Sequence, residues 1–338
     1  MNAQKEFEAM LAKDDQWCRQ LGFSDFEGLN HIIRKGHSVQ LVNLCEARHE
    51  NMCSTIANEI VNRGKVKVVL LAGPSSSGKT STSLRISLQC KVHGLNPIPI
   101  ELDNYFVDRE QTPRLPNGEY DYECLEAMDI ALLNSQLNDL IAGKEVVIPR
   151  FDFKQGRKFY DGKALSLKGN DILILEGIHA LDPGLTVHID EEVKFRIFVS
   201  DVSATSTYDP RIRPTDNRLL RRIVRDFRTR GISPEQNILR WSSVRAGEEK
   251  YIFPFQQYAD AIFNSTLQYE LPLLKYFVTS PLKEIKESSN AYPTAKRLLD
   301  FLENIDPLPL EAVMAIPSTS LMKEFIGWQT LSHNLDLV

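Results

Sequence analysis

The chain has 338 residues, 42% of them apolar, which suffices for one large domain with appendages or for two ordinary domains. Its formal net charge of −5 argues against a general nucleic-acid-binding protein, so any anion site has to be local. Five scattered cysteines without a C-x-x-C pair indicate neither a disulfide framework nor a zinc site, and they favour a reducing compartment. The charged N-terminus lacks an apolar signal core and no apolar run reaches membrane length, so we expect a cytoplasmic protein without membrane contact.

The first 62 residues carry apolar side chains at helical spacing and predict a helical N-terminal section. Residues 66–72 (VKVVLLA) predict a buried strand, and residues 73–80 (GPSSSGKT) match the phosphate-binding loop G-x-x-x-x-G-K-[ST] in full. A chance match in a Ser/Gly-rich linker is the alternative, which the strand before and the helix after the motif argue against. The motif predicts nucleoside triphosphate binding, with Lys79 on the β- and γ-phosphates and Thr80 on Mg²⁺. The cofactor-binding residues expected here are Gly73, Ser75, Ser76, Ser77, Gly78, Lys79, Thr80 and Ser81.

Short apolar runs then alternate with amphipathic stretches, which predicts βαβ units and a parallel sheet flanked by helices on both faces. The further strand candidates are residues 97–102, 145–148, 171–175 and 194–199. The helix candidates are residues 125–141 with Gly143 as C-terminal cap, 216–231, 234–246, 294–304 and a last turn at 321–326. Residues 149–167 are polar and aromatic with turn residues, which predicts a protruding hairpin. We expect an α/β P-loop NTPase fold with a helical section 1–62, a P-loop domain 63–281 whose lid spans about 211–258, and a helical C-terminal extension 282–338.

Two acidic residues stand where predicted strands end, at the edge where open α/β sheets bind their ligands. Glu176 ends the run ILILEG and is expected to contact Mg²⁺ or its water shell; a strand-end residue facing solvent is the alternative. Asp103 follows the strand 97–102 and is expected to accept the proton of an attacking hydroxyl, with an Asx-turn residue as the alternative. The predicted metal site therefore consists of Thr80, Glu176 and Asp103.

Eight arginines lie between Arg211 and Arg230. Helical spacing puts four of them near one face, which suits a closing lid that neutralises the transferring phosphoryl group. A solvated basic face paired with Asp216 and Asp226 is the alternative. The lid hypothesis gives catalytic roles to Arg218 and Arg222, beside Asp103 and Lys79, and nucleotide-binding roles to Arg221 and Arg225.

The chain resembles the uridine kinase and phosphoribulokinase branch of P-loop kinases, in particular bacterial uridine-kinase-like nucleoside kinases. The resemblance rests on residues 72–81, 102–123, 149–158, 174–185, 213–231, 243–265 and 323–327 (KEFIG). It implies a nucleoside-kinase-like fold, ATP and Mg²⁺ as cofactors, Asp103 as general base for a 5′-hydroxyl, and Mg²⁺ ligation by Glu176 and Thr80. Several members carry an N-terminal part similar to accessory domains of threonyl-tRNA synthetase, of which residues 1–62 would be a remnant.

The substrate motifs depart from the pattern of pyrimidine ribonucleoside kinases. Those relatives use a Tyr after the catalytic Asp, a Y-D-F-x-x-H motif and an Asp in F-D-H-P-D, where this chain has Phe106, residues 151–156 (FDFKQG) and 120–124 (YDYEC). Phe stacks but cannot hydrogen-bond a base edge. The substrate-binding candidates are Phe106, Asp121, Glu123, Phe151 and Arg157.

These features predict an ATP- and Mg²⁺-dependent kinase of a small hydroxylated metabolite, in the first place a uridine- or cytidine-like nucleoside at its 5′-hydroxyl. A kinase of a sugar, sugar phosphate or other polyol is one alternative. A nucleotide-dependent switch or RNA-associated regulator is another, although no guanine-reading N-K-x-D motif follows the loop. The expected partners are ATP and the small-molecule substrate, without nucleic acid, and the C-terminal helices could form a homo-oligomer.

Overall fold

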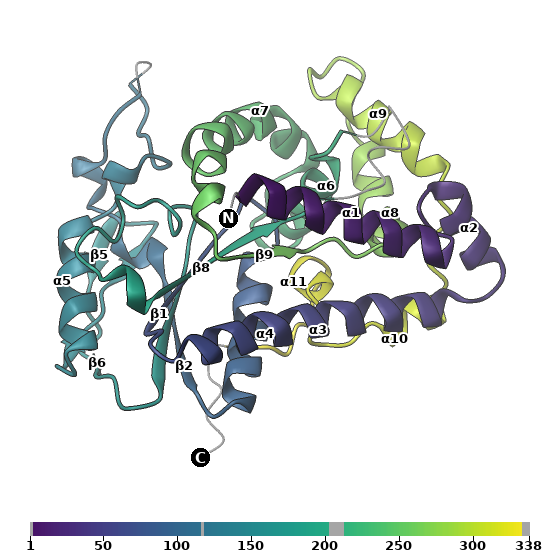
Figure 1. The fold of residues 1–338 in the computed structure, drawn as a ribbon. Helices are drawn as coiled ribbons and strands as arrows, with labels where there is room; N and C mark the ends of the chain where they lie inside the picture. The colour runs from purple at the N-terminus through teal and green to yellow at the C-terminus, as the bar shows by residue number, and fades with distance from the viewer. Residues whose placement is uncertain (1–2, 116–117, 203–212, 333–338) are drawn as a thin grey trace.

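The computed structural model of the chain describes residues 3–115, 118–202 and 213–332 (Figure 1). Its helices are α1 (Ala3–Leu21), α2 (Phe26–Arg34), α3 (Ser38–Arg63), α4 (Lys79–Val92), α5 (Ile130–Ile141), α6 (Asp216–Thr229), α7 (Pro234–Tyr251), α8 (Glu270–Lys283), α9 (Tyr292–Glu303), α10 (Leu310–Ala315) and α11 (Met322–Ile326). Its strands are β1 (Val68–Ala72), β2 (Asn96–Glu101), β3 (Val146–Val147), β4 (Arg150–Asp152), β5 (Arg157–Phe159), β6 (Ala164–Leu165), β7 (Asp171–Glu176), β8 (Lys194–Ser200) and β9 (Ala261–Asn264).

The central sheet has five parallel strands in the order β2-β7-β1-β8-β9. Four of them occupy predicted strand segments, and every residue of β1 and β8 is buried, as expected for a parallel sheet covered on both faces. The fifth, β9, was not predicted because its four residues lack a strand-length apolar pattern. The prediction of a strand at 145–148 is wrong for this sheet, because β3 pairs antiparallel with β6 outside it.

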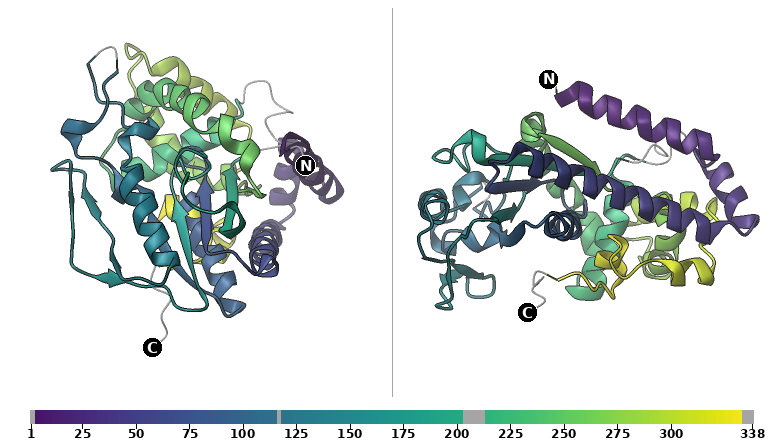
Figure 2. Two further views of the ribbon diagram at one scale, coloured as in Figure 1. Left: turned by 60° about the vertical axis from the view of Figure 1, so that its left-hand side comes forward. Right: turned by 60° about the horizontal axis from the view of Figure 1, so that its bottom comes forward.

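Alternating side chains of the strands divide the core into two layers. On one face Val69 and Leu71 pack with the N-terminal helices, α6 and the C-terminal helices. On the other face Leu70 packs with α5 and the segment that leads to the hairpin. Figures 1 and 2 show this division, with α5 and the hairpin on one side of the sheet and α1, α3, α8 and α9 on the other.

Within the hairpin expected at 149–167, β4 pairs antiparallel with β5, and β6 pairs antiparallel with β3, which lies just before this range. The helix expected at 125–141 is interrupted, because a 3₁₀ turn at Leu125–Ala127 precedes α5. Asp129 causes the break by capping α5, since its side chain accepts a hydrogen bond from the backbone N of Leu132. The helix α8 between β9 and α9 was not predicted, and Pro281 lies inside it.

The N-terminal and C-terminal sections share one core with the sheet. Buried Tyr269, at the start of α8, donates a hydrogen bond to Glu46 of α3, and Ser320, just before α11, donates to the same carboxylate at 2.6 Å. Asn30 of α2 contacts the backbone of Asn304 and Asp306 beyond α9. These contacts hold both ends of the chain against the same face of the sheet; the domain boundaries at 62 and 281 stay a prediction.

Candidate active site

The predicted phosphate-binding loop joins the C-terminal end of β1 to α4. Gly73 is required there, because a Cβ atom would lie 2.1 Å from the carbonyl oxygen of Val199. Gly78 has φ +86°, and Ser76 adopts φ 59°, both in the left-handed region that a tight anion-binding loop uses. The hydroxyls of Ser76 and Ser77 are buried and have no hydrogen-bond partner among the described residues. Such unpartnered donors inside a loop indicate a place for an anionic ligand.

Lys79 is folded back over the loop. Its Nζ donates to the carbonyl oxygens of Gly73 at 2.9 Å and Pro74 at 3.2 Å. Burial lowers the pKa of Lys79, while the nearby Glu176 opposes this shift. The ammonium therefore lies where it can turn from backbone carbonyls to phosphate oxygens.

Thr80 and Glu176, two of the three predicted metal ligands, lie side by side. The parallel register places Glu176 of β7 beside Leu71 of β1, so both strands end at the same level. Thr80 Oγ1 donates to Glu176 Oε1 at 2.8 Å, and Glu176 Oε2 is buried with no hydrogen-bond partner in the part of the chain that the structure describes. Burial raises the pKa of Glu176 to about 7. A hydroxyl beside an unpartnered carboxylate oxygen fits the hard-oxygen ligation of Mg²⁺.

Asp103 lies on the 3₁₀ turn Leu102–Tyr105 that follows β2. It lines a cavity of about 300 Å³ together with Lys79, Thr80 and Glu176. Desolvation raises the pKa of Asp103, whereas the charge of Lys79 lowers it. Asp103 thus lines the same cavity as Lys79, in a position where its carboxylate can accept a proton.

Four of the five arginines of α6 fall into two groups. Arg222 and Arg225 line the cavity, joined by Arg230 just after the helix. All three share one fully buried carboxylate, Asp226, at 3.5 Å, 2.8 Å and 3.4 Å. Three guanidinium groups on one carboxylate concentrate positive charge on this wall of the cavity, which favours an anionic ligand beside them.

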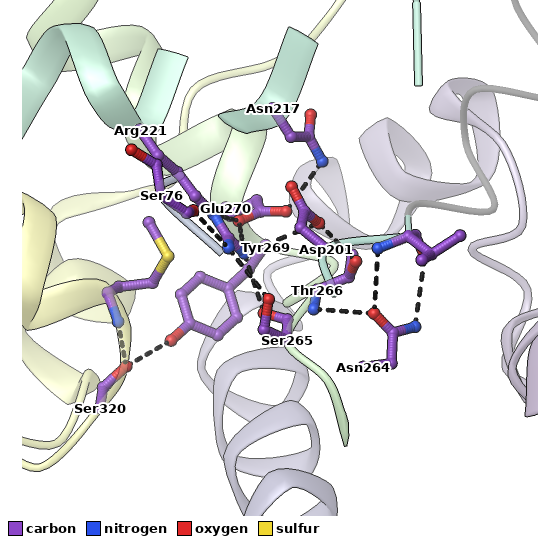
Figure 3. Close-up of polar contacts among 12 residues, drawn as sticks. Ser76, Asp201, Asn217, Arg221, Asn264, Ser265, Thr266, Tyr269, Glu270 and Ser320 are labelled. Carbon is purple, nitrogen blue, oxygen red and sulfur yellow. Dashed lines mark hydrogen bonds and ion pairs between the residues drawn. The ribbon is translucent and has the colours of Figure 1, made fainter. Parts of the chain in front are cut away.

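Arg218 and Arg221 point elsewhere. Arg218 donates to both carboxylate oxygens of Glu248 on α7, and its Nη1 reaches the carbonyl of Ser75 at 3.1 Å. Arg221 is fully buried; its Nε donates to Glu270 at 2.7 Å and its Nη2 to the carbonyl of Ser265 at 2.8 Å (Figure 3). Arg218 thus links α6 to α7, and Arg221 links α6 to α8, beneath the loop. Arg211 lies outside the described residues.

The predicted substrate-binding residues also divide into those that line the cavity and those that do not. Glu123 lines the cavity, but Phe106, Asp121, Phe151 and Arg157 do not. Phe106 packs on Phe151 with ring centroids 5.7 Å apart, and Asp121 accepts a hydrogen bond from Tyr251 at 2.9 Å. Arg157 is exposed beside Glu110.

Gly156, where relatives of the pyrimidine type carry His, has φ +70°, and a Cβ atom there would lie 2.7 Å from the guanidinium of Arg109. Nothing but glycine fits this turn without strain.

Other cavity residues were not singled out from the sequence. They are Glu101, Gly177, Ile178, Val244 and Glu324. Glu101 is the last residue of β2, two positions before Asp103, so the strand-end signal that identified Asp103 applies to it as well. Glu324 comes from the KEFIG segment near the far end of the chain, and the residues themselves carry no local signal for a contact with the loop.

A parallel sheet with a phosphate-binding loop after its central strand, a Thr–Glu pair beside the loop and arginines over it define a P-loop kinase. The model of the phosphoribulokinase / uridine kinase family matches residues 68–271. The chain belongs to this family, and it is a phosphotransferase with a hydroxyl group as acceptor. The fold and family expected from the sequence are thereby confirmed.

Individual relatives agree with the family. Uridine kinase of Macrococcus caseolyticus is 31% identical over 199 residues, which cover 59% of this chain and 87% of that protein. Uridine kinase of Ligilactobacillus salivarius is 32% identical, over 60% of this chain and 87% of its own. Uridine kinase of Schizosaccharomyces pombe is 34% identical, over 49% of this chain and 33% of its own.

Two solved structures are more distant. A possible uridine kinase from Bacillus stearothermophilus has a TM-score of 0.37 at 18% identity and covers 59% of this chain and 89% of its own. D-glycerate 3-kinase from Cryptococcus neoformans has a TM-score of 0.35 at 13% identity, with coverage of 62% and 88%. Among the described residues, none of the helices is long and apolar enough to span a bilayer.

Proposed function

We propose that the chain is an ATP- and Mg²⁺-dependent kinase that phosphorylates a small hydroxylated metabolite, in the first place a nucleoside at its 5′-hydroxyl. One observation carries the proposal: Lys79, Thr80, Glu176 and Asp103 converge on a single cavity beside arginines that share one carboxylate. Phosphoryl transfer needs positioned positive charge and one proton acceptor, and these residues supply both.

Each side chain has a task in this reaction. Lys79 leaves the loop carbonyls to neutralise the terminal phosphates, while Arg222 and Arg225 neutralise charge on the transferring group. Thr80 and Glu176 would hold Mg²⁺, which supplies charge neutralisation between phosphates when it is bound. Asp103 takes the proton of the acceptor hydroxyl as its oxygen bonds to phosphorus and the bond to the leaving phosphate breaks.

A second candidate acceptor is a sugar or other polyol, including phosphorylated ones. A further cavity of about 410 Å³ lies between β2 and the hairpin, and it shares Glu101 with the first. Arg150, Asp161 and Lys163 line it, which gives polar and cationic groups to an acceptor that enters from this side. The aromatic contact of Phe106 with Phe151 instead favours a flat ring nearby.

The test is ATP turnover without acceptor and with a panel of nucleosides, sugars, sugar phosphates and polyols. A kinase gives turnover that depends on one acceptor class, and Lys79→Ala in parallel excludes contaminating activity. Slow hydrolysis that ignores every acceptor would favour the nucleotide-dependent switch and contradict the proposal.

A further inference from the structure

The end of the chain brings a carboxylate to the phosphate-binding loop. Glu324 Oε2 accepts hydrogen bonds from the backbone N of Ser81 at 3.2 Å and from its Oγ at 2.6 Å. Gln329 Nε2 donates to the same Ser81 Oγ at 2.7 Å. Ser81 lies in the first turn of α4, where backbone N–H groups lack helical partners and point to an anion. An internal carboxylate thus holds donors that a P-loop offers to phosphate.

The backbone that carries Glu324 is firmly seated. Leu321, Met322 and Phe325 are fully buried, and Leu321 packs against Gly78 of the loop. Arg228 of α6 donates to the carbonyl oxygens of Phe325 at 3.1 Å and Glu324 at 3.2 Å. Exposing several core side chains costs more than losing one charge-assisted contact. Any movement is therefore confined to the Glu324 side chain.

Glu324 differs from the other carboxylate on the loop. Glu248 accepts from the backbone N of Ser75 at 3.0 Å, but Arg218 and Arg245 neutralise it, and only 2% of the residue is exposed. Within the part of the chain that the structure describes, no Lys or Arg lies within ion-pair distance of Glu324. An incoming phosphate that meets Glu324 would face a like charge that lacks a direct ion-pair partner, although Lys79 and Arg230 lie near enough to interact with it electrostatically.

The charges that line the cavity also favour displacement of the Glu324 carboxylate by phosphate. Its lining has four cationic side chains, Lys79, Arg222, Arg225 and Arg230, against five carboxylates, Glu101, Asp103, Glu123, Glu176 and Glu324. A triphosphate adds further negative charge, so binding favours removal of the carboxylate nearest the phosphate donors.

We propose that Glu324 is a positioning residue of the nucleotide site: its carboxylate keeps the Ser81 donors in place while no phosphate is bound, and its side chain turns away when phosphates take them, with α11 unmoved. The inference rests on the proposed function and adds a residue of the C-terminal extension to the nucleotide site.

Calorimetric titration with ADP and with ATP, each with Mg²⁺, tests it on the wild type, Glu324→Gln and Glu101→Gln. The Glu101 variant removes the same charge from the same cavity and is the matched control. Glu324→Gln is expected to tighten binding about tenfold, because a neutral amide competes less than a charge-assisted carboxylate contact. Glu101→Gln is expected to change affinity by about threefold or less. Equal tightening in both variants, or none in Glu324→Gln, overturns the proposal.

Hydrogen exchange of the amides of residues 321–327 with and without ADP gives a second readout. Unchanged protection is expected, because only the side chain moves; a large loss would show that the whole turn leaves and would contradict the inference. Absence of nucleotide binding in every variant refutes the proposed function together with this inference, whereas wild-type binding that Glu324→Gln does not alter refutes the inference alone.

Discussion

Arg221 offers a sharp test of how the arginine helix is used. The lid hypothesis assigns it to the nucleotide, but in the structure it is fully buried against Glu270, with further hydrogen bonds to Ser265 (Figure 3). Among the described residues, Arg221→Met would leave the carboxylate of Glu270 in the core with the amide of Asn217, at 2.9 Å, as its remaining side-chain hydrogen-bond partner. Removing one member of a buried ion pair costs about 3–5 kcal/mol of unfolding free energy.

The loss should depend on pH in a defined direction. Burial raises the pKa of Glu270, and the charge of Arg221 opposes that shift, so the variant raises it further. A carboxyl whose folded pKa lies above its unfolded value stabilises the fold when protonated and loses that contribution as pH rises. Arg221→Met is therefore expected to be less destabilised at pH 6 than at pH 8.

Urea unfolding followed by fluorescence and circular dichroism measures the change, with Arg222→Met as the matched control. Arg222 lines the cavity and its Nη1 donates to Ser75 Oγ at 2.7 Å, so its loss should cost about 1–2 kcal/mol in stability but weaken nucleotide binding more than Arg221→Met does. Suppose that Arg221→Met kept its stability within about 1 kcal/mol and lost nucleotide affinity more than a hundredfold. The structural role of Arg221, inferred from its burial against Glu270, would then be refuted.

Four further predictions follow from the site. Lys79→Ala should slow phosphoryl transfer more than about a hundredfold with the fold intact, as initial rates and circular dichroism would show; near-normal rates contradict the role of the loop. Asp103→Asn should lower kcat by about 10²- to 10⁴-fold with little change in ATP affinity by calorimetry, and lost binding with retained turnover would make Asp103 a metal ligand instead. Residues 213–258 should gain hydrogen-exchange protection when an ATP analogue with Mg²⁺ binds, whereas equal protection in both states would exclude a moving lid. Phe151→Tyr should improve kcat/KM for pyrimidine nucleosides with Gly156 retained, and a wild type that already prefers uridine or cytidine about a thousandfold over purine nucleosides would show that the hairpin does not read the base.

Much of the site could be predicted because its parts obey local rules. The loop motif depends on glycines that permit unusual backbone angles, and it identified residues that do line the cavity, such as Ser75, Lys79 and Thr80. Glu176 and Asp103 could be placed because strands of a parallel sheet end at one edge, and the register that sets Glu176 beside Leu71 and Glu101 bears this out.

The direction of the arginines could not be predicted. Arg218 and Arg222 are four residues apart and thus neighbours on α6, yet one is buried against Glu248 and the other faces the cavity. The carboxylate that fixes Arg218 lies on α7, and the one that fixes Arg221 lies on α8, a helix that the sequence pattern did not reveal. Helical spacing gives the face of a helix but not the charges that meet it.

The sequence by itself determined the parallel sheet, the phosphate-binding loop and the strand-end acids, because periodicity and backbone freedom act over a few neighbouring residues. Only the tertiary structure decided which arginines became part of the framework and which face the cavity. It alone also brought Glu324 to Ser81, 243 positions away in the chain. Burying a charge is costly unless a partner is present, and which partner is present depends on the packing of elements far apart in sequence.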